Sequence, residues 1–206
     1  METTRSSSEA GLRPPAWLAA VMHLVIVAAM PLLLVLINAR LLMSEAYIRW
    51  EYSRPGFPED PYGFTQEDRL RYAIPSLNYL FSPPESETLG DLTFPDGTPI
   101  YNERELSHMH DVKVVTRQLV RYGFALLGIW GVCVVGLAIH PTTRRVLYLA
   151  LFRGSFLTLA LIIVGLVTTA TSFNWLFAQF HALFFVGNSW IFPTSDTLIR
   201  LFPQKF

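Results

Sequence analysis

The sequence predicts an all-α bundle built into a membrane, with a small extracytoplasmic cap of mixed α and β structure. Three long runs without charged side chains predict the membrane part, at 17–37, 122–139 and 154–170. Each is close to the roughly 20 apolar residues that a helix needs to cross a bilayer core. An aromatic segment follows the third run and predicts a C-terminal interfacial or re-entrant helix. A long polar stretch between the first two runs predicts the cap.

The chain accordingly divides into consecutive segments. A cytoplasmic N-terminal tail at 1–15 leads into a first transmembrane helix at 16–43, and an extracytoplasmic cap follows at 44–104. A polar helix at 105–139 continues as the second transmembrane helix and ends at a cytoplasmic loop at 140–145. A third transmembrane helix at 146–172 leads to an aromatic extracytoplasmic or interfacial segment at 173–206. Basic residues in short loops face the cytoplasm. Arg5 and Arg13 precede the first span, and Arg144 and Arg145 join the second to the third, so the cap lies outside.

Charge and cysteine usage exclude several other classes. Lysine plus arginine balances aspartate plus glutamate at 16 each, so nothing in the bulk charge predicts a nucleic-acid partner. The single cysteine, Cys133, lies within the second apolar run, which predicts a packing role rather than a disulfide or metal site. His23 lies within the first run, and Arg153 directly precedes the third. We interpret His23 as a hydrogen-bonded packing residue, and Arg153 as snorkelling to the interface or preceding the true span.

The cap carries signals for both helix and hairpin. Residues 62–74 predict a short amphipathic helix with Thr65 as its N-cap and acidic residues in the first turn. The stretches 92–94 and 100–101 flank a Pro-Asp-Gly-Thr-Pro turn, with Asp-Gly at its tip, which is typical of a hairpin. This combination predicts the α+β cap.

A polar cluster precedes the second span. Asn102 and Glu105 have the spacing of a capping box, which predicts that the helix starts before the bilayer. His108 then shares a helix face with Asp111, three residues on. His110 lies about 200° round the helix from His108. His108 is therefore the candidate for chemistry, and we expect His110 at the solvent or headgroup surface.

The aromatic segment supplies a second histidine. Eight of the 20 residues at 173–192 are phenylalanine or tryptophan, and tryptophan is enriched at membrane boundaries. Polar residues in this segment make it a poor spanning helix, so we predict an interfacial or re-entrant element on the outer leaflet. His181 then faces the same compartment as His108. If the segment spanned instead, His181 would lie nearer the midplane and the C-terminus would be cytoplasmic.

These residues allow several functions. Two histidines beside an aspartate can perform general acid–base catalysis. No Gly-x-Ser-x-Gly motif occurs and the one cysteine lies mid-span, which argues against an acyl-enzyme route. The alternatives are a metal-dependent membrane hydrolase that binds its metal through His108, His110, Asp111 and His181, and a non-enzymatic assembly or interaction protein with the acidic cap as its surface. Buried structural histidines are the simplest interpretation.

Two motifs in order carry a family resemblance. His108-Met-x-Asp-Val-Lys113 precedes a span, and Phe180-His-x-x-Phe-Phe185 leads into Asn188-x-Trp-x-Phe192. Together they resemble the bacterial lipoprotein intramolecular transacylase family. The resemblance implies an enzyme of the bacterial cytoplasmic membrane with an extracytoplasmic site and no cofactor or metal. Its substrate would be a diacylated lipoprotein in a phospholipid membrane, whose sn-2 acyl chain moves to the α-amine of the N-terminal cysteine. The product would be an N-acylated lyso-lipoprotein.

The resemblance also implies roles for individual residues. His108 and His181 would be the catalytic pair, in roles that the sequence leaves unassigned, and Asp111 would orient a histidine. Lys113 and Asn188 are candidate donors to the oxyanion or headgroup, although Lys113 could equally snorkel. The residues expected to bind the acyl chain are Trp190, Phe180, Phe184, Phe185 and Tyr122. Family members usually continue into a fourth span, which this sequence does not show.

Overall fold

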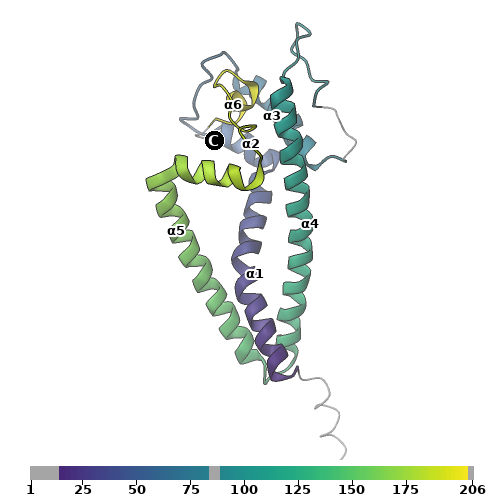
Figure 1. Cartoon of the computed structure of the whole chain (residues 1–206), viewed down its shortest axis with the longest axis vertical. Coiled ribbons are helices and arrows are strands. Elements are labelled where there is room, and N and C mark those ends of the chain that lie inside the picture. Colours follow the sequence, from purple (N-terminus) through teal and green to yellow (C-terminus); the bar gives the residue numbers. More distant parts are fainter. Residues whose placement is uncertain (1–13, 84–88, 204–206) are drawn as a thin grey trace, which may run out of the picture. The chain divides into compact units, whose positions relative to one another are not determined.

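The chain is helical throughout the part that the structure describes. A computed structural model describes residues 14–83 and 89–203. Its helices, labelled in Figure 1, are α1 (Ala16–Leu42), α2 (Glu45–Tyr52), α3 (Gln66–Phe81), α4 (Glu103–Ile139), α5 (Arg144–Phe184) and α6 (Thr197–Leu201). By length and composition α1, α4 and α5 can each cross a membrane, as predicted. Most of the predicted N-terminal tail lies outside the described residues.

Two compact units divide these helices. The first comprises Met1–Ile37 and Tyr122–Ser172, and the second comprises Asn38–Arg121 and Phe173–Phe206. The first unit therefore contains most of α1 and α5 and the uncharged C-terminal part of α4. The second contains the cap, the charged beginning of α4 and the aromatic segment, so all candidate site residues except Tyr122 belong to it.

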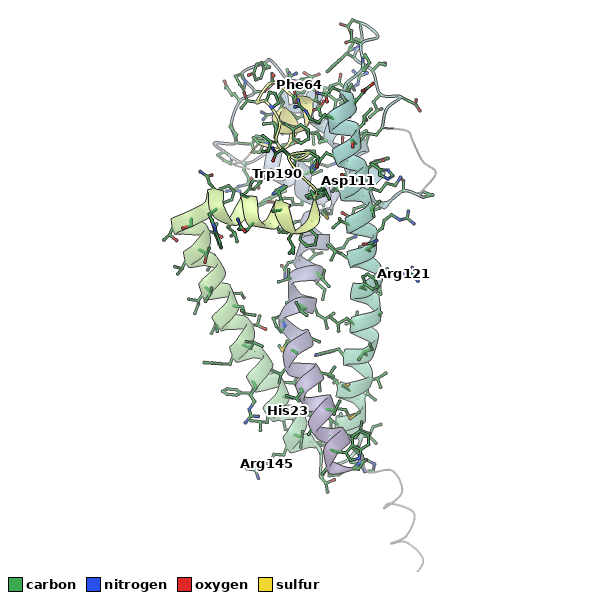
Figure 2. The ribbon with its side chains drawn as sticks, viewed as in Figure 1. His23, Phe64, Asp111, Arg121, Arg145 and Trp190 are labelled. Carbon is green, nitrogen blue, oxygen red and sulfur yellow. The ribbon has the colours of Figure 1, made fainter. Side chains whose placement is uncertain are left out.

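His23 joins α1 to α5 within the first unit. Its Nδ1 lies 3.4 Å from the Val146 carbonyl oxygen, and its Nε2 lies 3.2 Å from Nη1 of Arg153. Because a guanidinium only donates, Nε2 accepts and Nδ1 carries the proton. His23 is thus the hydrogen-bonded packing residue that the sequence predicted (labelled in Figure 2), and Arg153 is its partner. Cys133 packs nearby in the core of this unit, with Ala19, Ile26, Leu137, Leu147 and Ala150.

Gly154 permits a close approach of α5 to α1. A Cβ added at this glycine would lie 2.8 Å from Sδ and 3.3 Å from Cβ of Met30, and 3.5 Å from the Val27 Cα. Overpacking of a fitted contact typically costs about 1–3 kcal/mol. We therefore expect Gly154→Leu to lower the midpoint of thermal unfolding in detergent. Gly165→Leu is the matched control, since a Cβ there meets nothing within 4 Å. An equal shift in both variants would contradict the close approach.

The cap packs around α2, α3 and α6. Thr65 begins α3 with a complete capping box, because its side chain accepts from the Asp68 backbone and the Asp68 carboxylate accepts in return. The N-cap prediction is confirmed. The predicted end at residue 74 is wrong, because α3 continues through Pro75 to Phe81. The last two turns bury apolar side chains in the cap core, and this burial outweighs the one hydrogen bond that proline removes. That core comprises Ile48, Tyr52, Tyr72, Ala73, Leu77, Tyr79, Leu80, Leu89, Ile100, Tyr101, Met109, Leu198 and Leu201.

The predicted strands of the cap do not form. The turn itself is present, with Phe94 donating to the Thr98 carbonyl at 2.8 Å and Gly97 at φ +85°. Pairing stops at one isolated bridge between Thr93 and Pro99. Proline has no backbone N–H to extend a ladder, and a two-stranded hairpin is marginal by itself. The α+β cap is therefore corrected to a helical cap with a hairpin-like loop across the described residues.

Candidate active site

The charged first part of α4 positions His108. The Asn102 side chain accepts from the Glu105 backbone at 3.0 Å, and the Glu105 carboxylate accepts from the Asn102 backbone at 2.8 Å, which confirms the predicted capping box. All charged residues of α4 lie within 103–121, whereas 122–139 carries none. His108 therefore precedes the part of the helix that can cross a membrane. The capping box fixes the backbone at the start of α4, which belongs to the second unit.

His181 lies on the last part of α5, which is set apart by a break. Ser172 has non-helical dihedral angles (φ −148°, ψ 41°), and a helical stretch follows from residue 173 to Phe184. On this stretch, Nδ1 of His181 lies 2.8 Å from the Phe177 carbonyl oxygen, one turn earlier. A carbonyl only accepts, so Nδ1 carries the proton. The other ring nitrogen, Nε2, therefore has a free lone pair and can accept a proton.

Phe185 links the two histidines. Its ring centroid lies 4.9 Å from that of His108 and 5.7 Å from that of His181. Trp190 packs on His181, with the two ring centroids 4.8 Å apart. Phe192 completes the cluster at 5.3 Å from His108. The structure thus gathers both predicted catalytic histidines within one group of aromatic rings.

A turn at Gly187 returns Trp190 to His181. The helix ends with the bond from Phe185 N–H to the His181 carbonyl, and Gly187 then adopts φ +65°. This left-handed conformation costs other residues roughly 1–2 kcal/mol, and glycine adopts it freely. A second turn, in which Ile191 N–H donates to the Asn188 carbonyl at 3.1 Å, reverses the chain. Glycine at this position therefore allows the indole to reach the imidazole.

Burial determines the charge state of His108. Desolvation lowers its pKa below the usual 6.5, the neighbouring His181 lowers it further, and the Asp111 carboxylate opposes both. His108 is consequently neutral at pH 7. Asp111, labelled in Figure 2, acts through its charge, since its described contacts include no hydrogen bond to His108. The orienting role that the family resemblance implies for Asp111 stays a prediction.

Removal of the Asp111 charge should shift this titration. Because the carboxylate favours the protonated imidazole, we expect Asp111→Asn to lower the pKa of His108 still further. An activity that requires neutral His108 is lost at low pH as this imidazole is protonated, with a midpoint below pH 6.5. In Asp111→Asn this midpoint would move to lower pH. NMR of ¹³C-labelled histidine rings in detergent micelles measures the pKa directly. His110→Gln should leave it in place, and an upward shift in Asp111→Asn would contradict the assignment.

Two polar atoms of this cluster have no hydrogen-bond partner. Nδ1 of His108 and Nε1 of Trp190 are both buried without a partner in the described part of the chain. Leaving a buried donor or acceptor unpaired typically costs about 1–3 kcal/mol, so such groups are uncommon in folded proteins. Their presence together marks the cluster as a place where a polar ligand group is expected.

The other predicted site residues differ in how closely they contact the two histidines. Phe180 packs on His181 at 5.5 Å, and Phe184 packs on Phe180 at 5.0 Å. Lys113 is 2% exposed and holds its ammonium 4.1 Å from the centre of the Tyr79 ring, so it does not snorkel into solvent. The remaining three are exposed; they are Asn188, His110 and Tyr122.

Comparison with known proteins shows the family of the chain. A sequence model of the lipoprotein intramolecular transacylase Lit matches residues 22–206, nearly the whole chain. The chain belongs to this family. It is also similar to an uncharacterized protein of Aquifex aeolicus, with 33% identity over 183 residues that cover 89% of this chain and 81% of that protein. No solved structure matches it. Together with three apolar helices, Lit membership indicates a membrane transacylase that acts on lipoproteins.

Two aromatic residues of this cluster were not among the residues predicted for the site. Phe177 lies 4.1 Å from His181 between ring centroids and also supplies the carbonyl that fixes its tautomer. Its spacing of one helical turn from His181 was a usable signal. Phe192 belongs to the quoted motif, yet its contact with His108 joins residues far apart in sequence. Spacing within one element cannot reveal such a contact.

Glu105 ties the site helix to α6. Besides accepting from Asn102, its carboxylate accepts from the Leu198 backbone at 2.8 Å, in the first turn of α6. Thr197 adds a hydrogen bond to the Ile100 carbonyl at 2.7 Å, and an ion pair joins Arg200 to Asp60 at 2.9 Å. These contacts anchor the segment that follows Phe192. The histidine on α4 and the aromatic residues before α6 are therefore held by the same carboxylate.

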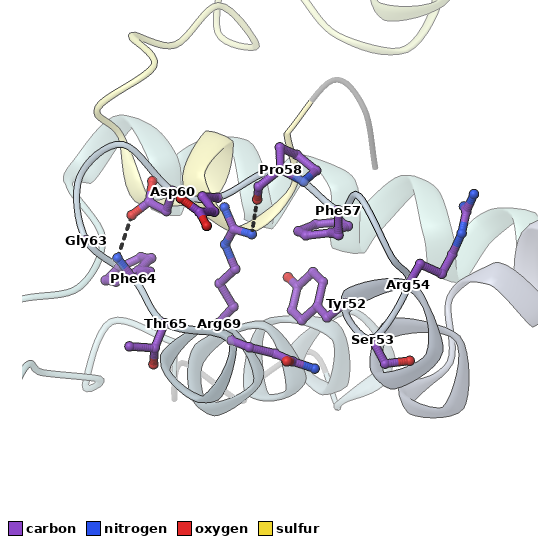
Figure 3. A pocket seen from close by; sticks show the side chains of 12 residues that line it. Tyr52, Ser53, Arg54, Phe57, Pro58, Asp60, Gly63, Phe64, Thr65 and Arg69 are labelled. Carbon is purple, nitrogen blue, oxygen red and sulfur yellow. Dashed lines mark hydrogen bonds between the residues drawn. The ribbon is translucent and has the colours of Figure 1, made fainter.

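A separate cavity of about 450 Å³ lies in the cap of this Lit protein (Figure 3). Arg54 and Asp60 form ion pairs with residues outside the lining, Glu51 and Arg200, and Nε of Arg69 is buried without a partner in the described residues. Arg69 donates to the Pro58 carbonyl at 2.7 Å and lies over the Phe57 ring, as Figure 3 shows, while Asp60 accepts from the Phe64 backbone at 2.7 Å. None of the predicted site residues lines it. We interpret its polar groups as supports for the loop between α2 and α3.

Proposed function

We propose that this protein moves the sn-2 acyl chain of a diacylglyceryl-modified lipoprotein to the α-amine of its N-terminal cysteine. The reaction would take place on the extracytoplasmic side of the cytoplasmic membrane and leave an N-acylated lyso-lipoprotein. Family membership supports the substrate class. The observation that carries the mechanism is the tautomer of His181, whose Nε2 can accept a proton beside a neutral His108.

The substrate brings its own nucleophile, so the protein needs only proton transfer and positioning. His181 Nε2 would accept a proton from the amine as the nitrogen attacks the ester carbonyl carbon. The neutral His108 would give its ring proton to the departing glycerol oxygen and regain one from the His181 imidazolium. An ester bond breaks, an amide bond forms and the net charge is unchanged. General acid–base steps of this kind typically contribute about 10²–10⁴-fold.

The surrounding rings would hold the acyl chain. Phe180, Phe184 and Phe185 offer apolar surface next to His181, and aromatic side chains bury large areas with little loss of rotamer freedom. Water exclusion by these rings would also favour aminolysis over hydrolysis of the ester. The neighbouring phospholipid is the medium from which the substrate would approach.

Mass spectrometry of lipoproteins tests the function in cells where this chain is the only N-terminal lipoprotein modifier. Intramolecular transfer does not change the total mass, so the fragments must be compared. In the product, loss of the thioglyceryl group removes one acyl chain and leaves the other on the peptide nitrogen. We expect this pattern with the wild-type chain and with His110→Ala. Only S-diacylglyceryl peptides with a free amine, at normal protein levels, would refute the transacylase proposal.

A further inference from the structure

Trp190 has a donor that the fold leaves unused. The indole packs on His181 with ring centroids 4.8 Å apart and planes tilted by 33°, and it forms an edge-to-face pair with Phe177 at a centroid distance of 5.8 Å. Its Nε1 is buried and has no partner in the described part of the chain. An indole N–H can only donate, so whatever pairs with it must be a hydrogen-bond acceptor. A lipid chain alone offers no such atom.

The neighbouring groups restrict what this acceptor can be. The His181 ring does not take the Trp190 proton, since the two rings stack and no hydrogen bond joins them. Phe177 and Phe185 also pack on His181, and their rings carry no polar atom. The group that enters therefore places an acceptor beside the indole while its reacting proton lies near His181. An ester carbonyl under attack by an amine has both features.

We propose that the Trp190 N–H donates to the carbonyl oxygen of the substrate ester and to the oxyanion that this oxygen becomes. The inference rests on the proposed function and adds a catalytic residue to it. In the resemblance Trp190 only lines the acyl groove, and the oxyanion role fell to Lys113 or Asn188. Lys113 instead faces Tyr79, and Asn188 is exposed.

The donor acts on a definite step. As the amine nitrogen bonds to the carbonyl carbon, the π electrons of the C=O bond move onto the oxygen. The indole proton stabilises this charge in a site with little water, where a fixed donor needs no reorganisation. When the C=O bond re-forms, the bond to the glycerol oxygen breaks and that oxygen leaves with a proton. Removal of one such donor elsewhere lowers kcat by about 10²–10³-fold.

Trp190→Phe removes the N–H and keeps an aromatic ring on His181. We expect kcat for a synthetic diacylated lipopeptide in detergent or nanodiscs to fall by about 10²-fold, with KM little changed. Trp175→Phe is the matched control, because Trp175 lies on the same stretch of α5 and is 60% exposed. It should retain full activity. Benzothienylalanine at position 190 keeps the bicyclic shape without the N–H and should reproduce the loss with an unchanged unfolding midpoint.

The outcomes separate this inference from the proposed function. If either variant at position 190 keeps kcat within about twofold of wild type, or changes KM alone, Trp190 only lines the groove and the inference is wrong. If benzothienylalanine restores the activity lost in Trp190→Phe, shape rather than the donor matters, which also overturns it. Absence of N-acylated product from the wild-type protein would instead overturn the proposed function.

Discussion

Replacement of His181 by alanine is expected to lower the rate of acyl transfer by about 10²–10⁴-fold, the usual contribution of a positioned acid–base group. The reason is specific to its geometry. The Phe177 carbonyl holds the Nδ1 proton, so Nε2 is available as a base before any substrate arrives. Single-turnover kinetics with a diacylated lipopeptide would measure the chemical step separately from product release.

His110→Ala is the matched control for this loss. It removes an exposed imidazole from the same unit and should leave the rate within about twofold of wild type. The His181→Ala protein is expected to fold, because its side chain is only half-buried and its hydrogen bond lies within one helix. Retention of wild-type rate in His181→Ala would remove this histidine from the mechanism and leave His108 as the sole candidate.

Glu105→Ala should produce the largest loss of stability. The carboxylate is 1% exposed and accepts from two backbone N–H groups, those of Asn102 and Leu198. Alanine would leave the buried Leu198 N–H without its partner, at about 1–3 kcal/mol. It would also remove the capping acceptor of the exposed residue Asn102, at about 0.5–2 kcal/mol. We therefore expect the free energy of unfolding to fall by about 2–5 kcal/mol, measured by denaturant titration in detergent micelles.

Glu103→Ala isolates the effect of the buried carboxylate. Glu103 lies in the same first turn of α4 but is exposed, so its loss should cost only the few tenths of a kcal/mol expected of an acid near a helix N-terminus. Glu105→Gln should fall between the two, since its amide keeps one acceptor oxygen. Equal losses at 103 and 105 would show that helix charge, rather than the tie to α6, sets the stability.

Local signals predicted the beginnings of helices well. The apolar runs identified three helices that can span a membrane, and the caps at Thr65 and Asn102 form as expected. Each of these signals involves residues within one or two turns, where sequence spacing determines which atoms meet. Ser44 gave a similar signal for α2, because its side chain accepts from the Tyr47 backbone, but that short helix was not predicted.

Long-range burial explains what local signals missed. The extra turns of α3 exist because their side chains reach a core shared with α6, and the hairpin stays a loop because two prolines limit its ladder. The same holds for the site. Helical phase separated His108 from His110, but the meeting of His108 with Phe192 depends on a chain reversal. Only the folded cap brings these residues together.

The shared carboxylate of Glu105 has a consequence for biosynthesis. His108 and the start of α4 leave the ribosome well before the aromatic residues, and the helix that Glu105 binds comes later still. A partly synthesised chain that ends before residue 181 therefore contains His108 but lacks His181, and its cap is incomplete. The second backbone partner of Glu105 becomes available only after α6 has been synthesised. On the proposed function, incomplete chains would not act on the lipoproteins that mature in the same membrane.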